Sequence, residues 1–121
     1  MEQKRTLISV RAEFDGDSPV RTVLQEGGFE LVEEYGGPDW SDHRTREKLP
    51  AFDAIVAGNE KFNMETMADA PRLRIIARFG VGYDRVDVDY CTERGIVVTN
   101  TPGAMAAAVA DLTFGLLLAL I

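Results

Sequence analysis

The sequence predicts an α/β domain of the flavodoxin-like, doubly wound type, with a parallel sheet of about five strands. Three observations support this. Short apolar segments alternate with helical ones, and the segments at 54–57, 73–77 and 96–99 are apolar on both faces. The length of 121 residues suits one domain with a sizeable core. Strands that are apolar on both faces are typical of a parallel sheet covered by helices on both sides.

The first half of the chain predicts two strands, with one helix between them and a second helix after them. Ser18 and Pro19 begin a helix, because serine caps a helix and proline gives up an amide that has no partner in the first turn. Gly27 and Gly28 end it. The expected elements are a strand at 6–11, this helix, a strand at 29–34, a turn at 36–40 and a short polar helix at 41–49 ended by Pro50.

The second half predicts the remaining strands and helices. Asn63 and Asp87 are suited to cap helices, and Gly95 to end the second of them. The expected elements are a strand at 54–57, a helix at 63–70, a strand at 73–77, a helix at 87–94, a strand at 96–99, a turn at 100–103 and a last helix at 104–121.

Ligands of such sheets bind where loops leave the carboxyl ends of the strands, so the positions to examine follow residues 11, 34, 57, 78 and 99. In the loop after the fourth strand, Gly80 and Gly82 allow a ligand to approach the backbone and offer adjacent amides to an anion. A plain tight turn is the alternative. Arg85 stands where a dinucleotide fingerprint needs its third glycine.

Other candidate groups have structural explanations. Asp84, Asp87 and Asp89 lack the glycine and the final glutamate of a calcium loop, so capping and surface roles are expected and no metal site is predicted. His43 is the only histidine and lies in a charged segment, where we expect it at the surface. Cys91 is expected to be a small buried side chain.

Composition limits the partners and the compartment. A formal net charge of -7 disfavours a nucleic-acid partner, which requires clustered Lys and Arg. Cys91 is the only cysteine, so an intrachain disulfide is impossible, and this fits a reducing compartment. The first residues lack the apolar stretch of an export signal. We therefore expect a cytoplasmic protein.

The segment 104–121 is apolar around its whole circumference, and this predicts a helix that something must cover. Asp111 near its middle makes membrane insertion unfavourable. We expect the helix to pack against a second copy of the chain, giving a homodimer or higher oligomer. We also expect the chain to be a piece of a larger protein that stops within this helix.

Three blocks of sequence resemble one enzyme family. They are IIARFGVGYD at 75–84, ERGIVVTNTPG at 93–103 and VADLT at 109–113, followed by a leucine-rich segment. In this order and spacing they resemble the D-isomer-specific 2-hydroxyacid dehydrogenases, which include phosphoglycerate dehydrogenases and glyoxylate/hydroxypyruvate reductases. The resemblance implies oxidoreductase activity with NAD or NADP, on a small 2-hydroxy or 2-oxo acid. It covers residues 73–120 closely, and the earlier chain only through its αβ order.

The resemblance also implies roles for particular residues. The backbone amides of Val81 and Gly82 would hold the substrate carboxylate, and Gly58 and Asn59 would line the same cleft. By this analogy 1–101 form an incomplete substrate-binding domain, and 102–121 form the hinge and first helix of a cofactor (Rossmann) domain.

In that last helix, Val109 and Thr113 would face the nicotinamide. The family's cofactor fingerprint and its catalytic Arg, Glu and His correspond to positions beyond Ile121. The resemblance therefore implies that these 121 residues alone are inactive and bind no cofactor. The alternative is a standalone flavodoxin-like module that binds or senses a small carboxylate without chemistry.

Overall fold

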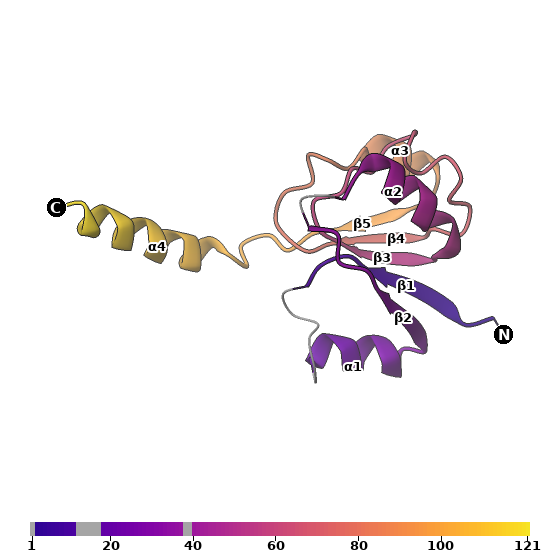
Figure 1. Cartoon of the computed structure of the whole chain (residues 1–121), viewed down its shortest axis with the longest axis horizontal. Coiled ribbons are helices and arrows are strands. Elements are labelled where there is room, and N and C mark those ends of the chain that lie inside the picture. Colours follow the sequence, from indigo (N-terminus) through magenta and orange to yellow (C-terminus); the bar gives the residue numbers. More distant parts are fainter. Residues whose placement is uncertain (1, 12–17, 38–39) are drawn as a thin grey trace.

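The computed structural model describes residues 2–11, 18–37 and 40–121, and the chain traces a single twisted sheet with helices around it (Figure 1). Five strands pair in the order β2-β1-β3-β4-β5, and every pairing is parallel. They are β1 (Lys4–Ile8), β2 (Phe29–Glu33), β3 (Ala54–Ala57), β4 (Ile75–Arg78) and β5 (Val97–Thr99). This is the predicted flavodoxin-like order, in which the strand sequence reverses between β1 and β3.

Helices flank the sheet unequally. The helices α2 (Asp42–Lys48) and α3 (Val88–Glu93) lie on one face, and α1 (Pro19–Glu26) lies on the other beside β2 (Figure 1). A short 3₁₀ turn, η2 (Leu49–Ala51), follows α2 and contains Pro50. The last helix, α4 (Ala106–Ala119), projects away from the sheet (Figure 1).

Two helix caps are formed by side chains, and the sequence suggested the one at Asp87. The Ser41 hydroxyl accepts a hydrogen bond from the Arg44 amide, and the Asp87 carboxylate accepts one from the Tyr90 amide. Ser18 occupies the cap position of α1, although its side chain makes no capping hydrogen bond. Gly95 follows α3 with a φ of 67°, a left-handed conformation that glycine adopts at little cost.

Four sequence predictions need correction. The strand expected at 73–77 is Ile75–Arg78, because pairing with β3 and β5 begins at Ile75. The first strand is Lys4–Ile8 and not 6–11, because the chain leaves the sheet at Ser9. Residues 63–70 form turns and no helix, although Asn63 accepts the expected hydrogen bond from the Thr66 amide. The following Pro71 disfavours helical backbone at the residue before it. The last helix begins at Ala106, two residues later than expected.

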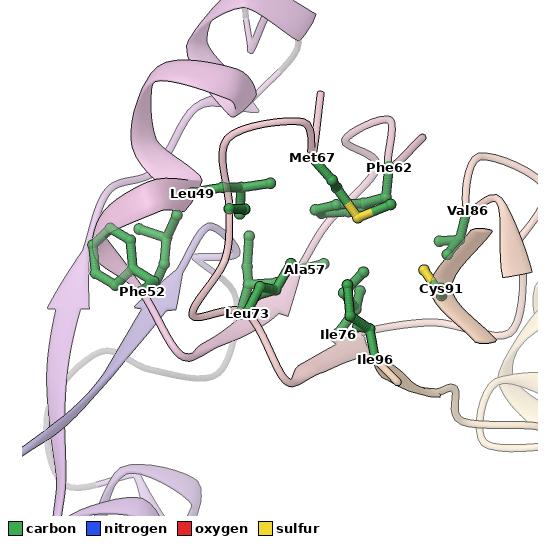
Figure 2. Packing of buried hydrophobic residues seen from close by; sticks show 13 residues of the cluster. Leu49, Phe52, Ala57, Phe62, Met67, Leu73, Ile76, Val86, Cys91 and Ile96 are labelled. Carbon is green, nitrogen blue, oxygen red and sulfur yellow. The ribbon is translucent and has the colours of Figure 1, made fainter. Parts of the chain in front are cut away.

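The core lies between the sheet and the helices α2 and α3. Figure 2 shows its buried side chains. Leu7, Ile55 and Ile76 are paired in register across β1, β3 and β4, and all three are fully buried. Phe62 covers this row from the loop after β3. Burying each such side chain contributes about 1.5–3 kcal/mol, so this face holds the domain together.

The opposite face of the sheet is covered in part. Helix α1 packs against β2, but Ile75 in β4 is only half-buried and Val97 in β5 is 56% exposed. The expected cover of helices on both sides is thus present at β1 and β2. It is absent over β5 in the described part of the chain.

Asp53 ties together the amino ends of three strands. Its carboxylate accepts a hydrogen bond of 2.8 Å from the Arg5 amide and one of 3.0 Å from the Arg72 guanidinium. Its carbonyl oxygen accepts the Arg74 amide at 2.8 Å. The hydrogen bond from Arg72 holds the pKa of Asp53 below its ordinary value of 3.8.

Candidate functional site

A cleft of about 940 Å³ lies at the carboxyl ends of four strands. Its floor and walls come from the loops that follow β1, β2, β3 and β4, the places where the doubly wound arrangement predicts a ligand. The residues that line it are Ser9, Val10, Arg11, Tyr35, Gly36, Gly37, Trp40, Gly58, Asn59, Glu60, Phe79 and Arg85. The residues 12–17 and 38–39 are outside the described chain.

The loop after β3 brings Gly58 and Asn59 to this cleft, as the sequence predicted. The Gly58 amide donates to the Ser9 hydroxyl at 3.1 Å, and that hydroxyl donates to the Val56 carbonyl at 3.2 Å. These bonds hold the loop against β1. A Cβ on residue 58 would lie 3.1 Å from Val10 Cγ1, so a larger residue here would require the Val10 side chain to shift.

The loop after β4 is anchored on both sides. The Phe79 amide donates to the Ala57 carbonyl at 2.9 Å, and the Arg78 guanidinium donates to the same carbonyl at 3.3 Å. On the β5 side, the Asn100 amide group donates to the Val81 carbonyl at 2.9 Å. Gly80 has a φ of 149°, which a side chain would strain. The loop is thus held in position without a helix or a strand.

The amides of Val81 and Gly82 lie in this anchored loop. Neither donates a hydrogen bond to any residue in the described ranges. Val81 is 47% exposed, and Gly82 is exposed as well. Both residues stand beside the cleft and are not among those that line it. Two adjacent unpaired amides on a fixed loop form a suitable site for a small anion.

Glu60 was not anticipated from the sequence. Its side chain lines the cleft, yet the residue is only 6% exposed. Its Oε2 atom is fully buried and has no hydrogen-bond partner among the residues that the structure describes. A buried acidic group without a donor is rare in proteins, because the unmet hydrogen bond is costly. A ligand or an ordered water that donates to Glu60 would remove this cost.

The β2 side of the cleft is a fixed aromatic wall. The Trp40 indole donates to the Thr45 hydroxyl at 2.8 Å, and the Arg44 guanidinium stacks on its ring at 4.4 Å from the ring centre. A Cβ on Gly36 would overlap the indole. Arg11 stands 5.9 Å from the Tyr35 ring centre on the same side. This wall limits the size of any ligand that extends from the β3 and β4 loops.

Val109 and Thr113 lie one turn apart on α4 and outside the cleft. The Thr113 hydroxyl donates to the Val109 carbonyl at 2.7 Å, and every residue of α4 is exposed. No described residue offers the phosphate-binding glycine turn of a dinucleotide site.

The remaining candidates of the sequence have the expected surroundings. His43 is exposed on α2. Cys91 is buried in the core, and burial raises the pKa of its thiol, which disfavours the reactive thiolate. Among the described residues no group of acidic, His and Cys side chains is arranged to hold a metal ion. None of the helices in those residues combines the length and apolarity needed to cross a bilayer.

Most lining residues that the sequence did not single out follow β1 and β2. The rule that directs attention to the carboxyl ends of strands located these loops, but it could not select Tyr35, Trp40 or Glu60 within or near them. Trp40 and Glu60 reach the cleft because their loops bring them close to Gly36 and Gly58. The spacing and composition of the sequence do not encode these close approaches.

Comparison with known proteins places this geometry in a family. Residues 13–115 match the model of the D-isomer specific 2-hydroxyacid dehydrogenase catalytic domain. The chain belongs to the D-isomer-specific 2-hydroxyacid dehydrogenase family. This confirms the family suggested by the three sequence blocks.

Three relatives illustrate the membership. A glyoxylate reductase of Thermococcus litoralis is 40% identical over 104 residues, which are 79% of this chain and 31% of that protein. The TT0316 protein of Thermus thermophilus has a crystal structure that matches with a TM-score of 0.83 and 31% identity, covering 95% of this chain and 36% of that one.

The third is a solved structure from Sinorhizobium meliloti. It is an NADPH-dependent glyoxylate/hydroxypyruvate reductase in complex with NADP and malonate, and it matches with a TM-score of 0.65 and 33% identity. The match covers 97% of this chain and 34% of that protein. The chain thus spans about a third of the length of these relatives.

Proposed function

We propose that this chain forms the substrate-binding part of an NAD(P)-dependent dehydrogenase that reduces a small 2-oxo acid to its D-2-hydroxy acid. The observation that carries the proposal is the pair of unpaired amides at Val81 and Gly82, on a loop fixed beside the cleft. Two adjacent N–H groups match the two oxygens of a carboxylate. Family membership supports this use of the loop.

The cleft residues position the rest of the substrate. We propose that a small 2-oxo acid, with its carboxylate on the Val81 and Gly82 amides, extends toward Gly58 and Asn59, which line the cleft. Because both loops are already anchored, binding costs little further conformational entropy. A bound nicotinamide would supply the hydride, and the face of Val109 and Thr113 would form one wall of its pocket.

We further propose that residues 1–101 belong to the substrate domain, and that 102–121 form the hinge and the first helix of a cofactor domain. Three features support this division. Gly103 has a φ of 77° in the turn before α4, α4 has no buried residue, and the face of the sheet over β5 is open. The exposed helix and the open face of the sheet are suited to contact further protein.

An activity assay tests the proposed reaction. The product of the full reading frame that contains this chain should oxidise NADH or NADPH in the presence of glyoxylate or hydroxypyruvate. The 121-residue chain alone should not, because its described residues offer no phosphate-binding glycine turn to hold the cofactor that supplies the hydride. Oxidation of the cofactor by the short chain would contradict the proposal, as would a full product that reduces no 2-oxo acid.

A standalone carboxylate-binding module is the second candidate, and one observation favours it. The sheet, the cleft and the unpaired amides are all formed within the described residues. Binding without chemistry would therefore need nothing further. A reading frame that stops near residue 121 would support this candidate, and one that continues with a Gly-x-Gly-x-x-Gly segment would exclude it.

The apolar helix α4 supports a proposal of self-association. Its 14 residues form a helix about 21 Å long at 1.5 Å per residue, and Leu112, Phe114 and Leu116 are each at least 60% exposed. We propose that copies of the chain associate through 104–121 in the cytoplasm. The substitution Leu116→Glu should convert a dimer to a monomer in light scattering, whereas Val23→Glu on α1 should not. A monomeric wild-type chain at micromolar concentration would contradict this.

A further inference from the structure

The acid in the cleft lacks a partner. Glu60 is 6% exposed, and its buried Oε2 receives no hydrogen bond from the described chain. Leaving a buried acceptor unsatisfied is unfavourable, and more so when the acceptor carries charge. The domain tolerates this at a position that lines its main cleft. Such a group is typical of a binding site whose donor arrives with the ligand.

The local backbone holds the Glu60 side chain in the cleft. A Cβ on Gly58 would lie 3.3 Å from Glu60 Oε1, so the glycine leaves the space that the acid occupies. The Gly58 amide is fixed by the Ser9 hydroxyl at 3.1 Å. On the far side, Phe62 is fully buried two residues after Glu60. The carboxylate therefore sits between two anchored points and has little freedom to turn toward solvent.

Two cations also line the cleft but lie at its rim. Arg11 and Arg85 are both exposed, and within the described residues neither forms an ion pair with Glu60. Water and salt screen exposed charges strongly, whereas a buried carboxylate is screened much less. The inner part of the cleft should therefore favour a hydrogen-bond donor and disfavour an anion.

We propose that Glu60 is a specificity-determining residue. It accepts a hydrogen bond from a hydroxyl group on the third carbon of a short 2-oxo acid, and it disfavours a phosphate at that carbon. This rests on the proposed function, in which the amides of Val81 and Gly82 hold the carboxylate at the other end of the substrate. A hydroxyl can donate to the Glu60 carboxylate where it lines the cleft, and the negative charge of that carboxylate repels a phosphate.

Substrate competition in the product of the full reading frame tests the proposal. The wild-type protein should reduce hydroxypyruvate with a kcat/KM at least about tenfold above that for phosphohydroxypyruvate, and above that for pyruvate, which lacks the hydroxyl. Glu60→Gln keeps the size of the side chain and removes its charge. It should reduce the preference for hydroxypyruvate over phosphohydroxypyruvate by about tenfold. The matched control Glu65→Gln changes an exposed acid on the neighbouring turn and should leave this preference unchanged.

The outcomes separate this inference from the proposed function. If the wild-type protein prefers phosphohydroxypyruvate, or if Glu60→Gln leaves the preference unchanged, the role of Glu60 is wrong while the dehydrogenase activity stands. If the wild-type protein reduces glyoxylate but none of these three acids, this inference fails and the proposed function stands. If it reduces none of the four acids, both fail. A wild-type preference for phosphohydroxypyruvate overturns the role of Glu60 even if Glu60→Gln does not fold.

Discussion

Two acidic residues at opposite ends of β3 (Ala54–Ala57) differ in their surroundings. Asp53, before the strand, accepts hydrogen bonds from the Arg5 amide and from Arg72. Glu60, after the strand, is more deeply buried and its Oε2 has no partner in the described residues. The first acid is satisfied within the domain and stabilises it. We propose that the second accepts a hydrogen bond from a ligand at the carboxyl ends of the strands.

The largest expected effect comes from removing the satisfied acid. Asp53→Ala leaves the Arg5 amide and the Arg72 guanidinium without their acceptor and should lower the free energy of unfolding by about 2 kcal/mol. Urea denaturation measures this. The control Asp69→Ala removes a surface ion pair with Arg46 and should change the free energy by less than about 1 kcal/mol. If both variants lost the same free energy of unfolding, Asp53 would stabilise the domain no more than a surface ion pair does.

Acid should weaken the same contribution. The folded-state pKa of Asp53 lies below its ordinary value of 3.8 because of Arg72, so its contribution is present above that value and is lost as the pH falls through the lowered pKa. Lys48 lowers the pKa of Glu34 in the same sense. The difference between wild type and Asp53→Ala should therefore hold from about pH 7 down to the ordinary pKa of 3.8 and shrink as the pH falls further. A difference that stays constant as the pH falls below that value would show that Asp53 acts without its charge.

The smallest expected effect on stability has the opposite sign. Glu60→Gln should leave the free energy of unfolding unchanged or raise it by up to about 1 kcal/mol, because the carboxylate that it removes has no partner. Thermal and urea denaturation of Glu60→Gln and the wild-type protein check this. A loss as large as that of Asp53→Ala would mean that Glu60 is satisfied within the domain, and the contrast would disappear.

Sequence reasoning located the sheet and the edge that carries the cleft. The segment 54–57 was placed correctly because it is a short apolar run between polar or turn residues. Asp87 and Gly95 marked α3 because their local chemistry fixes the ends of a helix. The first strand was misplaced because the apolar pattern continues past Ile8, whereas the backbone leaves the sheet there.

The details of the cleft could not be predicted in the same way. Gly58 and Asn59 were expected in it through family resemblance, and the structure places both there. The burial of Glu60 depends on how the loop after β3 folds, with the Glu60 carboxylate close to Gly58, an arrangement that no periodicity encodes. The positions of Val109 and Thr113 relative to the cleft depend on the turn at 100–105, and their role remains a proposal.

The central claim is that the unpaired amides of Val81 and Gly82, in the loop after β4, bind a small carboxylate. The most direct test is a titration of the ¹⁵N-labelled chain with glyoxylate, followed through its amide resonances, with uncharged acetamide as the control ligand. We predict saturable shifts that are largest at Val81 and Gly82, smaller at Gly58 and Asn59, and absent at Asp53. Immobile Val81 and Gly82 resonances, or equal shifts with acetamide, would contradict the claim.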